Sequence, residues 1–230
     1  MDKKSNPHRP TLSAPAHRAA APLIALAAAF LAASLASAPA RAQFSEPHTV
    51  HVLDASALHP PAGARVAIIE FDDLECPACA HANPVLMQAA ASYKIPWVRR
   101  DFLIPGHIWS PIAAVNARWF DTKSKTLGDE YRNYIFANQI SIETQPELRQ
   151  FTQKFAAAHG IAMPFAVDPQ GKLAAEVQAD TNLAERMGLK ETPTIFIAIA
   201  NSKGPQYIQV LQVDQDLYRD IDQALDYARH

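Results

Sequence analysis

Residues 68–79 read Ile68-Ile-Glu-Phe-Asp-Asp-Leu-Glu-Cys-Pro-Ala-Cys79 and contain both cysteines of the sequence. This stretch begins inside a run of apolar and β-branched residues, 65–71, which predicts a buried strand because the run is too short for a helix. The alanine-rich segment 78–93 then predicts a helix, with Pro77 in the first turn, where a missing N–H has no cost. The two cysteines therefore lie at the junction of a strand and a helix.

This position predicts redox chemistry for the cysteine pair. Cys76 would lie beside the unpaired N–H groups and the positive dipole end of the helix, which favour a thiolate and lower the pKa. Cys79 returns one turn later, buried beneath Cys76, so it would resolve a mixed disulfide formed at Cys76. Half of a zinc site is the first alternative, but no second cysteine pair exists and His81 is the only nearby imidazole in the sequence. A passive disulfide is the second, yet so short a loop constrains the unfolded chain very little.

The first 42 residues predict a secretory signal peptide. Residues 1–18 are polar and basic, residues 19–40 carry no charge, and Ala40-Arg41-Ala42 fits the small-x-small pattern of a cleavage site. An uncleaved membrane anchor is the alternative, since about 20 apolar residues suffice to cross a bilayer. The high alanine content makes the segment weakly hydrophobic, which favours cleavage. We therefore expect export to the periplasm or cell envelope.

Composition limits the partners and the disulfide content of the rest of the chain. The formal net charge is −2 at pH 7, and the leader holds five Lys/Arg against one Asp, so the remainder is more acidic. This balance argues against nucleic acid or an anionic membrane surface as the main partner. The 230 residues contain only two cysteines, too few for a structural disulfide framework. The chain after the leader is long enough for one domain with a substantial core.

Hydrophobic patterning outside the cysteine segment predicts an α/β fold with helices between its two halves. The first 21 residues after the leader, 43–63, form a polar extension with at most one short strand at 49–53. The order is strand, helix, strand, a block of helices, then two strands as a hairpin and a closing amphipathic helix. The further elements are strands at 97–102, 194–199 and 207–213 and helices at 111–120, 127–138, 147–159, about 173–187 and 214–227.

Two segments in this order resemble the DsbA-like branch of the thioredoxin superfamily. The first is the quoted segment 68–79, in which a hydrophobic-Glu-Phe strand precedes the first cysteine, and the second is Met187-Gly-Leu-Lys-Glu-Thr-Pro-Thr-Ile-Phe-Ile197. The two motifs together are much more specific than either alone. The resemblance implies a thioredoxin fold (β-α-β … β-β-α) over residues 64–230, with a helical insertion at about 106–188.

The resemblance also implies roles for individual residues. Cys76 would be the nucleophile and Cys79 the resolving thiol, facing a cis-proline at Pro193, while Thr192 would offer its backbone to a substrate peptide. A trans turn proline is the alternative for Pro193. Glu70 would lie beneath the site as an acid–base for Cys79, with a pKa raised by burial. Its alternative is a strand-end glutamate that reaches solvent.

The residues between the cysteines bear on the direction of electron flow. Pro77 and Ala78 would contact substrate and surround the Cys76 sulfur, and the absence of the histidine that often follows the proline predicts a milder oxidant. His107 would border the substrate groove with Trp109. We expect an oxidase of exported proteins, with a reductase second. An isomerase is weaker because a separate N-terminal dimerisation domain is missing, and a non-catalytic peptide-binding or chaperone-like module is the alternative from another class.

Thiol–disulfide exchange sets the expected cofactors and partners. The redox-active disulfide Cys76–Cys79 would serve in place of a metal, flavin or nucleotide, and the sequence has no glycine-rich phosphate loop. The expected partners are cysteine-containing exported proteins and a membrane redox partner that resets the cysteine pair. The missing dimerisation domain predicts a monomer.

Overall fold

The computed structural model describes residues 51–229. The signal peptide and the alternative membrane anchor lie outside these residues and stay predictions. Within the described part, no helix combines the length and apolarity needed to cross a membrane.

The first half of the fold is a β-α-β unit that carries the cysteines. Strand β1 (Val66–Asp72) is buried along its whole length, helix α1 (Pro77–Tyr93) starts with a proline, and β2 (Trp97–Asp101) returns parallel to β1. Lys94 ends α1 in the left-handed conformation, with φ 54°, and its N–H caps the last turn. The predicted strand–cysteine–helix junction is confirmed.

The second half completes a four-stranded sheet. Strands β3 (Thr194–Ile199) and β4 (Tyr207–Val210) form an antiparallel hairpin, and the sheet order is β2-β1-β3-β4. Glu70 of the central strand β1 lies opposite Arg99 of β2 on one side and Ile195 of β3 on the other. The sheet therefore places two charged residues next to each other in its interior.

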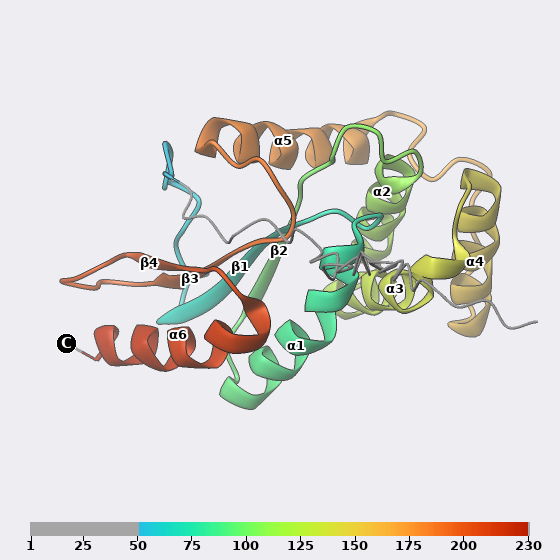
Figure 1. Ribbon diagram of the computed structural model, residues 1–230. Helices are drawn as coiled ribbons and strands as arrows, with labels where there is room; N and C mark the ends of the chain where they lie inside the picture. Colours follow the sequence, from blue (N-terminus) through green and yellow to red (C-terminus); the bar gives the residue numbers. More distant parts are fainter. Residues whose placement is uncertain (1–50, 230) are drawn as a thin grey trace, which may run out of the picture. The chain divides into compact units, whose positions relative to one another are not determined.

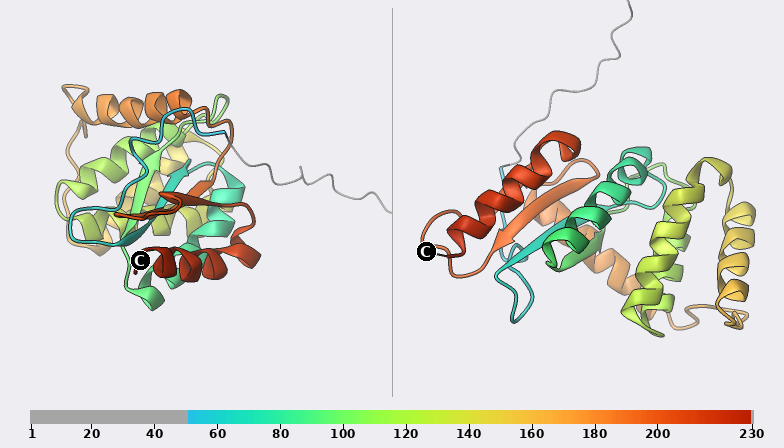
Figure 2. Two further views of the ribbon diagram at one scale, coloured as in Figure 1. Left: turned by 90° about the vertical axis from the view of Figure 1, so that its left-hand side faces the viewer. Right: turned by 90° about the horizontal axis from the view of Figure 1, so that it is seen from below.

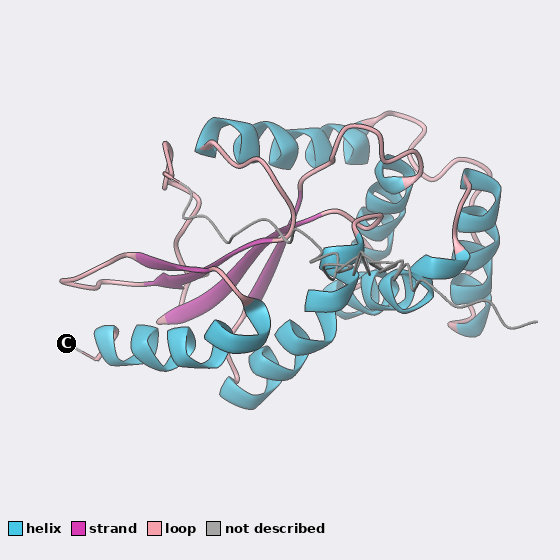
Figure 3. Cartoon of the chain, viewed as in Figure 1, coloured by secondary structure: helices cyan, strands magenta, loops and turns pink. Residues whose placement is uncertain are grey.

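Helices cover both faces of the sheet. Figure 1 shows α1 and α6 (Val213–Tyr227) on one face and α5 (Lys172–Met187) on the other. The views in Figure 2 and the colouring in Figure 3, with magenta strands between cyan helices, show the same three layers. Apolar side chains of β1, β3, α1 and α6 form one core, and the α5 side of the sheet forms another.

The block of helices predicted between the two halves is present. It consists of four further elements before α5, namely α2 (Ser110–Asp121), α3 (Lys125–Asn138), the short 3₁₀ helix η1 (Gln139–Ser141) and α4 (Gln145–Ala158). Thr144 and Glu147 form a capping box at the start of α4. Aromatic side chains from α2, α3 and α4 pack ring to ring, among them Phe120, Tyr131 and Phe155. These aromatic side chains form a core that also includes both cysteines.

Two strand predictions differ from the structure by more than one residue. Residues 51–53 form no strand, and the Leu53 N–H instead donates to the Met187 carbonyl at 3.0 Å. Strand β4 ends at Val210 rather than Val213, because the first turn of α6 takes up the residues that follow. There the Asp216 carboxylate accepts a hydrogen bond from the Gln212 N–H at 3.0 Å.

Candidate active site

The cysteine pair occupies the first turn of α1. Cys76 is the N-cap residue, with extended backbone angles (φ −77°, ψ 121°), and Cys79 follows inside the helix. Both are free thiols, Cys76 being 8% exposed and Cys79 fully buried. Pro77 and Ala78 between them are exposed. One sulfur therefore lies close to the surface and the other directly in the core.

The two thiols have opposite acidities. Hydrogen bonding from Cys79 is the main cause that lowers the pKa of Cys76 to about 6, and the backbone N–H groups of Cys79 and Ala78 add to it. Burial raises the pKa of Cys79 well above its usual value, and the bond to Cys76 acts in the same direction. At neutral pH the pair is therefore a thiolate at Cys76 beside a neutral thiol at Cys79.

A loop from the far half of the chain faces the cysteines. The Thr192–Pro193 peptide bond is cis, and the Thr192 carbonyl lies 3.3 Å from the Cys76 sulfur, from which it accepts a hydrogen bond when Cys76 is protonated. Behind it, the Thr194 hydroxyl donates to the Glu191 carbonyl at 2.7 Å and holds the turn into β3. Thr192 and Pro193 are half-buried, so the loop borders the sulfur and also reaches solvent.

Glu70 lies in the protein interior and does not reach solvent. Its side chain is fully buried, and one carboxyl oxygen accepts from the Trp97 indole N–H at 3.0 Å, while the other, Oε1, has no hydrogen-bond partner in residues 51–229. Burial, with the charge of Asp72 second, raises the Glu70 pKa to about 8. Electrostatic interaction couples Glu70 to both cysteines. The carboxyl therefore carries a proton at neutral pH, and its charge, once it ionises, raises the Cys79 pKa.

Sequence reasoning missed the buried cation of this site. The Arg99 guanidinium donates twice to Asp72 Oδ2, at 3.1 and 3.2 Å, lies 3.9 Å from Glu70 Oε2, and stacks 4.5 Å from the centre of the Trp97 ring. The charge of Asp72 raises the Cys79 pKa, as does that of Glu70. The sequence did contain a signal for a buried cation, because the charged pair Arg99-Arg100 lies inside a predicted strand, as Glu70 does.

Gln139 is a second residue that the sequence did not reveal. From η1 its amide donates to the Leu74 carbonyl at 2.8 Å and to the Cys76 carbonyl at 3.1 Å. One side chain of the insertion thus holds the loop that carries the nucleophile. No local pattern marks Gln139, because its role depends on a contact across 63 residues.

Three residues near the pair are engaged in structural contacts. The Glu75 carboxylate points toward the start of α2, where it accepts from the Trp109 and Ser110 N–H groups at 2.7 and 2.9 Å. His107 Nδ1 lies 3.0 Å from Asp73 Oδ2. Trp109 is buried and donates to the Ile142 carbonyl, so the expectation that it borders a substrate groove is wrong: its ring fills the core of the insertion.

Metal binding receives no support from the part of the chain that the structure describes. Residues 51–229 contain no cluster of three or more His, Cys, Asp or Glu side chains able to hold an ion. His81, the one imidazole near the cysteines in sequence, instead pairs with Asp214 of α6 at 2.8 Å.

Comparison with known proteins gives a family and a set of similar folds. The family model described as Thioredoxin matches residues 61–212. A search of curated proteins found no significant match. Among solved structures, alpha-DsbA1 of Wolbachia pipientis superposes with a TM-score of 0.61 at 16% identity, covering 74% of this chain and 91% of that one.

Two further structures have similar folds. BdbD from Bacillus subtilis has a TM-score of 0.57 at 17% identity, with 75% of this chain and 92% of that one covered. A periplasmic thioredoxin-like protein from Salmonella enterica serovar Typhimurium has a TM-score of 0.57 at 19% identity, with 72% and 87% covered. With a thiolate-forming cysteine at the start of α1 and a buried partner one turn on, the chain belongs to the thioredoxin family of thiol–disulfide oxidoreductases and has the DsbA-type fold.

Proposed function

We propose that this protein is a periplasmic oxidase that transfers the Cys76–Cys79 disulfide to cysteine pairs of exported polypeptides. The observation that carries the proposal is the asymmetry of the pair: a near-surface Cys76 with a pKa lowered to about 6 beside a fully buried Cys79 whose pKa is raised. A stabilised Cys76 thiolate favours the reduced protein and so makes its disulfide a stronger oxidant. The predicted signal peptide supports the location.

The exchange starts from the disulfide form and proceeds in two displacements. A substrate thiolate attacks the Cys76 sulfur, the Cys76–Cys79 bond breaks, and the bonding pair leaves on Cys79. Glu70, protonated at neutral pH, supplies the proton that makes Cys79 a neutral thiol. A second substrate thiolate then attacks the substrate sulfur of the mixed disulfide and expels Cys76 as a thiolate. The substrate loses two electrons and the protein gains two.

The surroundings of Cys76 suit these two displacement steps. The Thr192 backbone lies within hydrogen-bond distance of Cys76, which allows an extended substrate to pair with it beside the sulfur. Pro77 and Ala78, which follow Cys76 in the chain, are exposed, so an attacking thiolate can approach from solvent beside them. The chemistry uses only cysteine sulfurs and a carboxyl proton, so we propose no metal, flavin or nucleotide. A quinone-linked oxidant in the membrane would remove the two electrons, and the protein would act as a monomer.

The equilibrium reduction potential of Cys76–Cys79, titrated against glutathione in the protein freed of its leader, tests the proposal. We expect a value between about −120 and −200 mV, in the range of oxidising members and the isomerases. A value close to that of thioredoxin, about −270 mV, would overturn the oxidase and identify a reductase. A pair that never equilibrates would leave only a peptide-binding module.

A further inference from the structure

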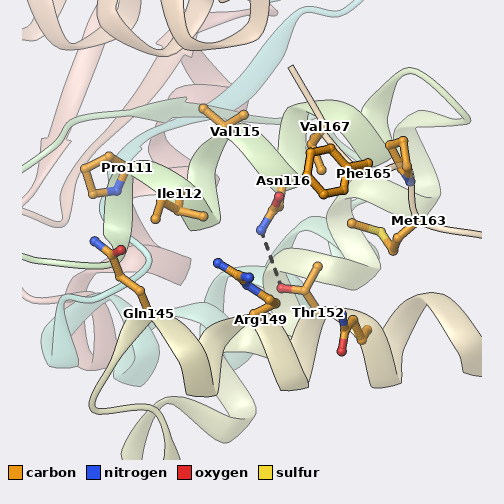
Figure 4. A pocket seen from close by; sticks show the side chains of 12 residues that line it. Pro111, Ile112, Val115, Asn116, Gln145, Arg149, Thr152, Met163, Phe165 and Val167 are labelled. Carbon is orange, nitrogen blue, oxygen red and sulfur yellow. Dashed lines mark hydrogen bonds between the residues drawn. The ribbon is translucent and has the colours of Figure 1, made fainter. Parts of the chain in front are cut away.

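The helical insertion contains a cavity that the thiol chemistry does not use. It has a volume of about 830 Å³ and lies between α2, α4 and the segment that follows α4, residues 161–167. Figure 4 shows Pro111 and Gln145 at one end and Met163, Phe165 and Val167 at the other. The volume falls within the range of pockets that hold a drug-sized ligand, about 300–1,000 Å³.

The two walls of this insertion cavity formed by α2 and by residues 161–167 are mainly apolar and partly exposed. Ile112 and Val115 of α2 face Met163 and Phe165 across it, and Ile112 is 41% exposed while the Phe165 side chain is fully exposed. Exposed side chains of this size are stabilised when a ligand removes them from water, by about 25 cal/mol per Å². The walls therefore fit an apolar side chain.

The α4 side of the cavity carries an unpaired cation. Arg149 has no ion-pair or hydrogen-bond partner within residues 51–229, and no Asp or Glu is among the residues that line the cavity. Two other arginines of the insertion are engaged: Arg132 pairs with Asp121 at 2.7 Å, and Arg118 pairs with Asp101 at 2.6 Å. The Arg149 guanidinium thus supplies donors suited to a carboxylate that the chain itself does not provide.

A free amide beside the cation indicates what kind of carboxylate ligand fits. Gln153 lies one turn after Arg149 on the same face of α4, lines the cavity, and has no partner in residues 51–229. A glutamine amide both donates and accepts, which matches a peptide group rather than a hydrocarbon chain. A chain of contacts links the cavity to the cysteine segment, since Pro111 lines the cavity and the preceding Ser110 N–H donates to Glu75, the residue before Cys76.

We infer that the insertion cavity binds a segment of the substrate polypeptide in which an apolar side chain is followed by an acidic residue. The apolar side chain packs against Ile112 and Phe165, the carboxylate pairs with Arg149, and Gln153 bonds the peptide group between them. Naming the occupant a substrate rests on the proposed function; the binding chemistry of the cavity does not. The site would give the enzyme a preference among unfolded polypeptides beyond the cysteine itself.

Binding of two cysteine-free peptides tests the cavity separately from the redox chemistry. The probes are fluorescent nine-residue peptides of Gly and Ser with a central Leu-Glu or Leu-Gln, measured by anisotropy on the protein freed of its leader. We expect Leu-Glu to bind about fivefold more tightly, the size of an exposed ion pair, and Arg149→Gln to abolish that preference. Phe165→Ala should weaken both peptides roughly tenfold. Lys154→Gln, on the same helix outside the cavity, is the charge-matched control.

The results distinguish a failure of the cavity site from a failure of the proposed function. A preference for Leu-Glu that survives in Arg149→Gln, or affinities unchanged by Phe165→Ala, would overturn the inference, as would no binding of either peptide at millimolar concentration. The oxidation of dithiothreitol by the disulfide form should be the same in wild type, Arg149→Gln and Phe165→Ala. If the protein binds Leu-Glu as expected but does not oxidise dithiothreitol, the proposed function fails and the cavity site stands.

Discussion

Replacement of Glu70 by glutamine should change how stability depends on pH. Glu70 is fully buried, and its pKa is raised from 4.5 to about 8, first by burial and then by the charge of Asp72. The Glu70 pKa is higher in the folded protein than in the unfolded chain. The free energy of unfolding therefore keeps its full value below pH 4.5, where Glu70 is protonated in both states, and decreases as the pH rises toward 8. Glutamine keeps an oxygen for the Trp97 N–H, which donates at 3.0 Å, and cannot ionise.

The size of the effect follows from the two pKa values. Between pH 5 and pH 8 Glu70 is mostly ionised in the unfolded chain and protonated in the folded protein, so each pH unit stabilises the unfolded state relative to the folded one. Above pH 8 the folded protein ionises too, and the difference stops growing. With 1.36 kcal/mol per pKa unit, the wild-type free energy of unfolding should fall by about 4 kcal/mol more than that of Glu70→Gln over this range.

Urea unfolding of the disulfide form at several pH values measures this difference. In that form neither thiol titrates, and Cys76 is the smallest of the causes that raise the Glu70 pKa. Glu176→Gln, at an exposed position of α5, controls for the loss of one negative charge. If the wild-type and Glu70→Gln curves run parallel to within about 1 kcal/mol from pH 5 to pH 8.5, the Glu70 pKa is not raised in the folded protein.

Three further perturbations probe the rest of the site. The ultraviolet absorbance of the reduced protein, measured against Cys76→Ser as the blank, should titrate with a midpoint near pH 6, because the Cys76 pKa is lowered to about 6. A midpoint above pH 8 would contradict the hydrogen bonds assigned to the Cys76 sulfur. Gln139→Leu should cost about 1–3 kcal/mol in free energy of unfolding, since the Leu74 carbonyl loses its donor and the Cys76 carbonyl keeps only the Ala80 N–H. Ile140→Ala at a 94% exposed neighbour should cost under about 0.5 kcal/mol, and equal losses would argue against the Gln139 contacts. Arg99→Met should cost about 3–5 kcal/mol at pH 7, because the buried Asp72 carboxylate, which is charged there in the wild type, loses its partner. The loss should be smaller at pH 5, below the wild-type Asp72 pKa of about 6, and a loss independent of pH would count against the ion pair.

Sequence patterns located the reactive centre because its signals are local. The apolar run of β1, the proline at the start of α1 and the spacing of Cys76 and Cys79 all act within about one turn or one strand, so no distant contact is needed to interpret them. Glu70 was identified for the same reason, since a carboxylate within an apolar strand needs a partner or a function.

The boundaries that sequence misplaced depend on competition between elements. Residues after Val210 could extend β4 by their apolar pattern, but hydrogen bonds of the first turn of α6 use their backbone groups first. Trp109 next to a loop histidine suggested a groove, and packing within the insertion buried it instead.

The α/β order, the redox pair and the buried carboxylate could be predicted from the sequence, because each depends on residues that are neighbours along the chain. The fold was needed to place Arg99 against Asp72, Gln139 on the Cys76 loop and Arg149 at the wall of a cavity. Contacts between α2 and α4, or between η1 and the start of α1, join residues tens of positions apart, and no periodicity in one segment encodes them. The lowered pKa of Cys76 depends on both, because the helix start is local, whereas the Thr192 side chain, which also lowers this pKa, comes from a loop 116 residues away.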